Sequence, residues 1–125
     1  MKFARRVFFG AGIYGLIVIL PLYFLEEKIG RDFPPLITHP EYYYGFIGVT
    51  LAWQVLFLVL ARDPVRYRAM MIPSVLEKAT YVVAVTALFL LGRVNIYTLG
   101  SGVVDLVFGL LFLIAFVKTK AAEAS

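Results

Sequence analysis

Hydrophobic residues gather into four long runs, and short segments between them hold most of the charged residues and prolines. A helix needs about 20 predominantly apolar residues to cross the hydrocarbon core of a bilayer, and each run meets or nearly meets that length. The pattern therefore predicts an all-α integral membrane protein, an antiparallel four-helix transmembrane bundle. We place the spans at about residues 7–25, 44–61, 72–92 and 102–117 of a single domain covering residues 1–125.

The first run follows a basic start that includes Lys2, as the apolar segment of a secretory signal would. The run is long and no small-x-small cleavage site follows it, so we interpret it as a retained first span, with a cleaved signal as the alternative. Pro21 is expected to kink the helix or end its last turn. Gly12 and Gly15 lie on adjoining parts of one helix surface, where small residues let two helix backbones approach closely.

The distribution of positive charge predicts the orientation of the bundle. Eight of the twelve Lys and Arg residues lie near the two ends of the chain or in the 62–68 turn. The two opposite loops hold Lys28, Arg31 and Arg93, and Lys78 lies within the third run. Lys and Arg are in excess in cytoplasmic loops, so both termini are predicted to be cytoplasmic in a multi-pass protein of the plasma membrane.

Composition narrows the possible functions. The chain is 62% hydrophobic and contains no cysteine, which excludes disulfides, thiol catalysis and cysteine-bound metals. Its basic residues flank the spans and form no long stripe, so no nucleic-acid partner is expected; membrane lipids are the expected surroundings. His39 is the only histidine and sits before a proline at a predicted helix start. No phosphate loop, nucleophile elbow or dinucleotide fingerprint is present, and we predict no catalytic residue, metal or cofactor.

Glu77 and Lys78 are unusual because they adjoin within an apolar span. One interpretation anchors both at the inner interface, with Lys78 extending its ammonium to the headgroups and Glu77 bonded to Arg66 or Arg68. Side chains of neighbouring helical residues point about 100° apart, so the two are not expected to face one partner. The rival interpretation turns Glu77 into the bundle as a buried carboxylate near Gln54 and Tyr81, which would make it a candidate site.

Asp105 lies about one turn into the predicted fourth span, for which Ser101 is the expected cap. It is expected either to stabilise the helix start or to face a polar pocket with residues such as Ser101, Thr50 or Tyr97. Glu77 and Asp105 enter the membrane from opposite sides, so their depths are expected to differ by more than about 10 Å. The candidate ligand or polar site is therefore a set of residues rather than a carboxylate pair: Gln54, Glu77, Tyr81 and Asp105.

Several segments of the chain resemble small bacterial four-span membrane proteins. The stretch 104–115, with an acidic residue opening the last span, is similar to the DoxX-like group. The stretches 44–54 and 62–68, together with Glu77 and Lys78, look like a set of uncharacterised bacterial proteins. The resemblance implies a four-helix fold in the bacterial inner membrane and association with redox or quinone-linked complexes. It carries over no catalytic residue.

Two functions follow from these observations. The first is a non-enzymatic membrane subunit or scaffold, a homo-oligomer or part of a larger complex, because the loops are short and the polar residues suffice for helix pairing. The alternative is a small membrane protein that binds or transports a lipid, quinone or small solute near Gln54 and Glu77. The orientation of Glu77 separates the two.

The predicted orientation can be tested with reporters. A reporter fused after Ser125 should be active in the cytoplasm, and one inserted near Arg31 should be active on the outer side, because Lys and Arg are retained inside. Each fusion is made with two reporters, one that is active only in the cytoplasm and one that is active only outside. Their activities measure the orientation of each site. The reverse pattern would contradict the predicted topology.

Overall fold

The computed structural model describes residues 2–124, and every regular element within that range is helical. Helix α1 spans Lys2–Ile19 and continues into the 3₁₀ helix η1, Leu20–Phe24, and the short helix α2, Glu26–Asp32. Helix α3 spans Pro40–Arg62 and η2 spans Arg68–Met70. Helices α4, Met71–Leu90, and α5, Ile96–Ala124, complete the fold.

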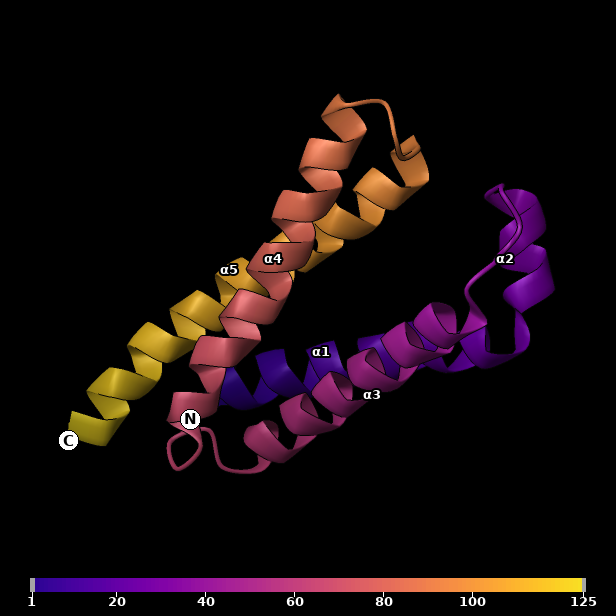
Figure 1. Cartoon of the computed structure of the whole chain (residues 1–125). Helices are drawn as coiled ribbons and strands as arrows, with labels where there is room; N and C mark the ends of the chain where they lie inside the picture. Colours follow the sequence, from indigo (N-terminus) through magenta and orange to yellow (C-terminus); the bar gives the residue numbers. More distant parts are fainter. Residues whose placement is uncertain (1, 125) are drawn as a thin grey trace.

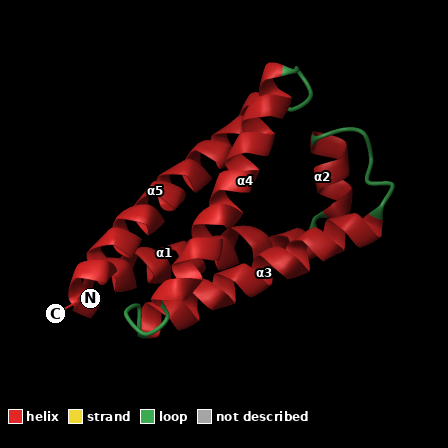
Figure 2. Ribbon diagram, turned by 60° about the vertical axis from the view of Figure 1, so that its left-hand side comes forward, coloured by secondary structure: helices red, strands yellow, loops and turns green. Residues whose placement is uncertain are grey.

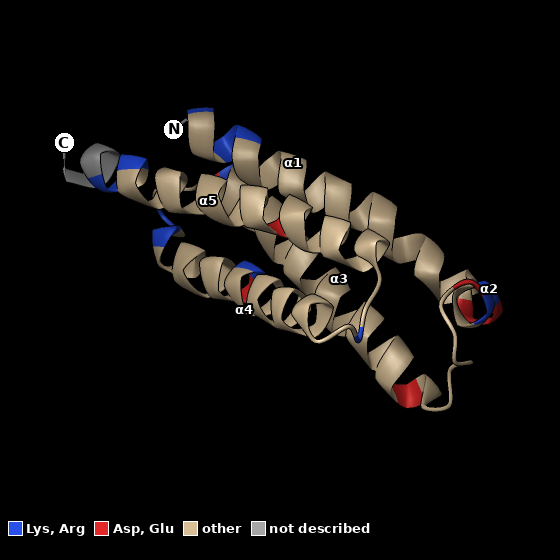
Figure 3. Cartoon of the chain, turned by 90° about the horizontal axis from the view of Figure 1, so that it is seen from above, with Lys and Arg blue, Asp and Glu red and all other residues tan. Residues whose placement is uncertain are grey.

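Four helical segments within residues 2–124 are long and apolar enough to cross a membrane: Lys2–Phe24, Pro40–Arg62, Arg68–Leu90 and Ile96–Lys120. They pack antiparallel, which confirms the predicted all-α four-helix architecture. Both termini lie at one end of the bundle (Figure 1). Many of the Lys and Arg residues also gather at that end (Figure 3). The change from α-helix to 3₁₀ helix occurs one residue before Pro21, where the sequence predicts a kink.

The bundle consists of two hairpins, α1 with α3 and α4 with α5. The hairpins converge near the termini and diverge towards α2 and the 91–95 turn, so the bundle is V-shaped (Figures 1 and 2). Phe8, Phe57 and Phe112 join them at the closed end, all fully buried. The rings of Phe8 and Phe112 stack with centroids 4.3 Å apart, and Phe57 meets Phe112 edge-on at 5.0 Å. These ring contacts tie α1 and α3 to α5.

Glycines set the close spacing within each hairpin. A Cβ at Gly12 would lie 2.7 Å from the Leu58 side chain and 3.0 Å from the Gln54 carbonyl oxygen, and one at Gly15 would overlap the Gln54 carboxamide. In the second hairpin, a Cβ at Gly109 would lie 3.3 Å from the Cβ of Lys78. Only a missing Cβ permits these approaches, which confirms the packing role that the sequence predicts for Gly12 and Gly15.

Helix α5 begins earlier than the sequence suggests. It starts at Ile96 rather than near Gly102, and Asn95 caps it by accepting a hydrogen bond from the Thr98 N–H at 2.9 Å. Ser101 is not the cap; its hydroxyl donates to the Thr98 carbonyl inside the helix. The predicted start was wrong because Asn95 and Ser101 are both suitable caps and the chain uses the earlier one.

The side chain of Arg68 lies against α5. Its guanidinium lies 3.7 Å from the centroid of the Phe116 ring and donates to the Phe116 carbonyl at 3.0 and 2.9 Å. It also donates to Thr119 Oγ1 at 3.2 Å. These contacts fasten the turn before α4 to the last part of α5.

Glycine spacing within the first hairpin predicts a measurable difference between two neighbouring alanine variants. Gly12→Ala should lower the free energy of unfolding by about 1–3 kcal/mol, because its methyl group overpacks a filled interface. Gly10→Ala is the matched control, since no heavy atom lies within 4 Å of a Cβ built there. Denaturation in mixed micelles, followed by the fluorescence of the single tryptophan, measures both. Equal stabilities would contradict this packing.

Candidate functional site

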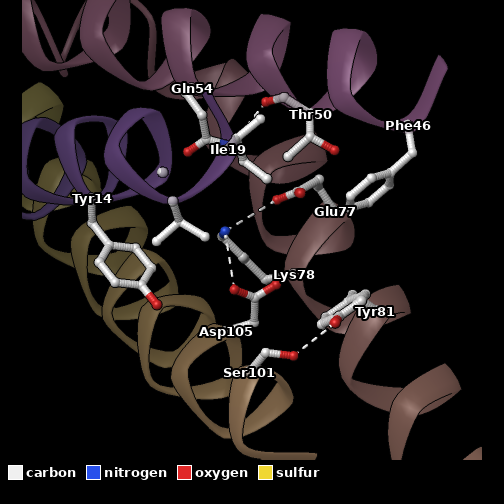
Figure 4. A pocket seen from close by; sticks show the side chains of 12 residues that line it. Tyr14, Ile19, Phe46, Thr50, Gln54, Glu77, Lys78, Tyr81, Ser101 and Asp105 are labelled. Atoms are coloured by element: carbon white, nitrogen blue, oxygen red, sulfur yellow. Dashed lines mark hydrogen bonds and ion pairs between the residues drawn. The ribbon is translucent and has the colours of Figure 1, made fainter. Parts of the chain in front are cut away.

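A cavity of about 130 Å³ lies between the hairpins, and all four long helices contribute to its walls. Helices α1 and α3 supply mainly apolar and small side chains, whereas α4 and α5 supply the charged ones (Figure 4). The cavity is partly open to the surroundings. Its lining is Tyr14, Gly15, Val18, Ile19, Phe46, Thr50, Gln54, Glu77, Lys78, Tyr81, Ser101 and Asp105. We name this cavity the inter-hairpin crevice.

Lys78 lies at the centre of the charged side of the inter-hairpin crevice. Its side chain is only 8% exposed, and its Nζ lies 3.4 Å from Asp105 Oδ1 and 3.6 Å from Glu77 Oε2. The ammonium also lies 5.3 Å from the centroid of the Phe57 ring, so it rests above the aromatic floor between the hairpins. One ammonium is therefore shared by two carboxylates, one on its own helix and one on α5 (Figure 4).

Both distances are longer than the 2.7–2.9 Å or so that is usual for a charge-assisted hydrogen bond. The cluster is thus an ion triad with a loosely held centre rather than a tight bidentate pair. An ammonium has three N–H donors, and only the contact with Asp105 is short enough to count as a hydrogen bond. The ammonium also lies 5.3 and 5.8 Å from the centroids of the Phe57 and Phe108 rings, so Lys78 is engaged by the carboxylates and by aromatic faces together.

Several expectations about these charges were wrong. Lys78 does not reach the headgroups, and Glu77 pairs with Lys78 rather than with Arg66 or Arg68. The charged ends of the two neighbours meet although their helix positions point about 100° apart, so helical direction alone did not decide their contact. The rival interpretation, in which Glu77 turns into the bundle, is the one that the structure supports.

Asp105 is not at a helix start, because α5 begins at Ile96. It lies beside Lys78, and the expected depth difference of more than about 10 Å from Glu77 was wrong. Lys78 and Asp105 lie at similar distances in sequence from the turn at Gly92, on opposite sides of it. Residues so placed in an antiparallel hairpin meet side by side. This symmetry about the turn is the signal that could have identified the pair from the sequence.

All four residues of the predicted site, Gln54, Glu77, Tyr81 and Asp105, line the inter-hairpin crevice. Tyr81 and Ser101 join α4 to α5 through a hydrogen bond of 2.7 Å between their hydroxyl groups. Gln54 is 2% exposed and donates from Nε2 to the Thr50 carbonyl at 2.9 Å. The sequence did not identify Lys78 as the central residue of the site, nor the wall formed by α1.

The inter-hairpin crevice has no metal-ligand set. Within residues 2–124, no group of three or more histidine, aspartate or glutamate side chains is placed to hold a metal ion. The arrangement offers instead a mixed polar end, made of carboxylates, an ammonium and a carboxamide, beside apolar walls. Such a lining is suited to holding one end of a small molecule that carries both polar and apolar parts.

The ion triad predicts a large asymmetry between two lysine variants. Lys78→Met should lower the free energy of unfolding by about 3–5 kcal/mol, because it leaves two poorly solvated carboxylates without their cation. Lys28→Met is the control, since the Lys28–Asp32 pair is exposed, and it should cost less than about 1 kcal/mol. Denaturation in mixed micelles measures both.

Removing the whole triad provides the reciprocal test. Adding Glu77→Gln and Asp105→Asn to Lys78→Met should recover much of the lost stability, because neutral side chains of similar size replace the charges. A Lys78→Met protein as stable as the wild type would show that the ammonium does not hold the carboxylates.

Comparison of the chain with protein-family models, with curated proteins and with solved structures finds no match. The resemblance to the DoxX-like group therefore stays a prediction carried by the quoted residues. The fold and the inter-hairpin crevice are established by the chain's own helices and contacts.

Proposed function

We propose that this four-span membrane protein binds a small amphiphilic molecule in the inter-hairpin crevice. The observation that carries the proposal is the composition of its lining. Apolar side chains from α1 and α3 face a charged cluster on α4 and α5 across a cavity of about 130 Å³. A lipid, a quinone or a small solute with one polar end is the class of ligand predicted from Gln54 and Glu77.

The cost of the charged cluster supports this function. A lysine or aspartate at the centre of a membrane helix costs about 2.5–3.5 kcal/mol on insertion scales. The contact between the two hairpins does not require such groups, since the aromatic rings already join α1 and α3 to α5. Ionisable residues facing an intramembrane cavity are a common feature of binding and transport sites.

The shape of the bundle also supports it. Each hairpin is closed by its own glycines, and the two hairpins touch mainly near the termini, so the crevice lies where they diverge (Figure 2). With the termini in the cytoplasm, as the basic residues predict, the diverging ends face the outer side. A ligand would then enter from the outer side or from the outer leaflet.

The scaffold function stays a prediction, as does membership of a redox or quinone-linked complex or a homo-oligomer. A ligand-binding crevice is compatible with either, because the outer faces of the helices remain free for other contacts. The two functions differ in one respect. Ligand binding requires the inter-hairpin crevice to be open, and a scaffold does not.

A pair of tryptophan variants tests ligand binding. Val18 lines the crevice, whereas Val83 is 69% exposed on α4 and is not among the lining residues. Val18→Trp should fill the crevice and abolish retention of the ligand, and Val83→Trp should retain it, because only the first indole occupies the cavity. Extraction with surrounding lipid, followed by mass spectrometry of the bound small molecules, measures retention.

The two variants should be equally helical by circular dichroism, which controls for misfolding. The same set and amounts of small molecules in the wild type and in Val18→Trp would contradict binding in the inter-hairpin crevice.

A further inference from the structure

The hydrogen-bonding groups around the inter-hairpin crevice indicate which chemical class of ligand it accepts. Two buried oxygen atoms on its walls have no hydrogen-bond partner, Gln54 Oε1 and Glu77 Oε2. Gln54 is more than nine-tenths buried. The hydrogen bond from its Nε2 to the Thr50 carbonyl fixes the orientation of the carboxamide. Its orphaned oxygen is therefore held as an acceptor. An unpaired buried acceptor costs about 1–3 kcal/mol, which a donor supplied by a ligand would offset.

Glu77 also has a buried acceptor oxygen without a hydrogen-bond donor. Its Oε2 lies 3.6 Å from Lys78 Nζ, which gives electrostatic attraction without a hydrogen bond. Oε2 is thus a buried carboxylate oxygen with a free lone pair, on the opposite side of the crevice from α3 (Figure 4). Gln54 and Glu77 offer two acceptors from two different hairpins.

The charged side chains of the lining are also unbalanced, with negative groups in excess. The lining contains two carboxylates, Glu77 and Asp105, and one ammonium, Lys78, with no other charged side chain among its twelve residues. With all three ionised, the cluster carries one net negative charge beside apolar walls. An anionic ligand would meet that charge, and Lys78 is already shared by both carboxylates. A cation that brings N–H donors satisfies both the charge and the free acceptors.

We infer that the inter-hairpin crevice selects a small organic cation with a primary ammonium group. The ammonium donates to Gln54 Oε1 and Glu77 Oε2, and the alkyl part lies along the apolar wall formed by Val18 and Phe46. This inference rests on the proposed function and names its ligand class. It disfavours quinones, whose carbonyl oxygens are acceptors and would leave the two orphaned oxygens unpaired.

Three probes of similar size test the class: n-butylammonium, 1-butanol and butyrate. Calorimetric titration of the protein in lipid nanodiscs, with empty nanodiscs subtracted, measures each affinity. Butylammonium should bind at least about tenfold more tightly than butanol, a difference of about 1.4 kcal/mol, and butyrate should bind more weakly than both. Equal affinities for the amine and the alcohol would overturn the inference, as would tighter binding of butyrate. A charged cluster that serves only to hold a proton would give equal affinities for the amine and the alcohol.

Variants assign the selectivity to residues. Glu77→Gln should weaken butylammonium binding about tenfold and butanol binding much less, because it removes the charge and keeps the side-chain shape. Glu27→Gln is the matched control, since Glu27 is exposed on α2 and outside the crevice, and it should change neither. If Glu77→Gln does not fold, Asp105→Asn provides the same comparison from α5. Unchanged amine affinity in the variant that folds would overturn the inference.

The outcome is separable from that of the proposed function. Loss of retained small molecules in Val18→Trp with no amine preference keeps the binding function and rejects the cation. Retention of the same molecules by Val18→Trp and the wild type rejects binding in the crevice itself.

Discussion

The ammonium of Lys78, shared between Glu77 and Asp105, is the interaction on which the rest of the structure depends. Three ionisable groups in apolar helices are tolerated only if they neutralise one another or reach water. Here the carboxylates come from two helices, so the cluster fixes how α4 and α5 align. Gly109, opposite the Cβ of Lys78, makes room for the lysine stem at the same level. The alignment of α4 with α5 and the positions of the charged residues therefore depend on each other.

The aromatic contacts and the glycines determine where the charges lie relative to the first hairpin. The stacking of Phe8 on Phe112 holds the hairpins together at the end near the termini. Gly12 and Gly15 bring α1 and α3 close enough for Gln54 to lie against α1, with its oxygen unpaired. Tyr14 contacts Phe108 with ring centroids 5.5 Å apart, and the Phe108 centroid lies 5.8 Å from Lys78 Nζ. The crevice is the space above this aromatic floor, where the two hairpins diverge.

The fold was largely predictable, because the length and hydropathy of the four runs leave little freedom in how a chain crosses a bilayer. The close approach at Gly12 and Gly15 was also readable, since it depends on the absence of Cβ atoms. The start of α5 was not, because Ser101 and Asn95 are both acceptable caps and only tertiary structure shows which one is used. That error displaced Asp105 to a helix end and concealed its pairing with Lys78.

The residues of the candidate site were predicted better than their interactions. Gln54, Glu77, Tyr81 and Asp105 were singled out because polar groups in apolar spans are costly, and all four line one cavity. Lys78 was assigned to the interface because a long lysine side chain can reach headgroups from many depths. Its actual direction depends on an acceptor from another helix, which no local pattern reveals. The wall formed by α1 is likewise a tertiary feature, set by the contact between the hairpins.

Thiol reactivity tests the central claim, that a polar crevice partly open to the surroundings lies between the hairpins. The chain has no cysteine, so single cysteines can be introduced without background. Thr50 lines the crevice, and its neighbour Val49 is 63% exposed on the outer, apolar surface of α3. In lipid vesicles, a membrane-impermeant methanethiosulfonate should modify Thr50→Cys rapidly and Val49→Cys very slowly, because only a hydrated thiol ionises and reacts. Equal rates at the two positions, or faster reaction at Val49→Cys, would contradict the account.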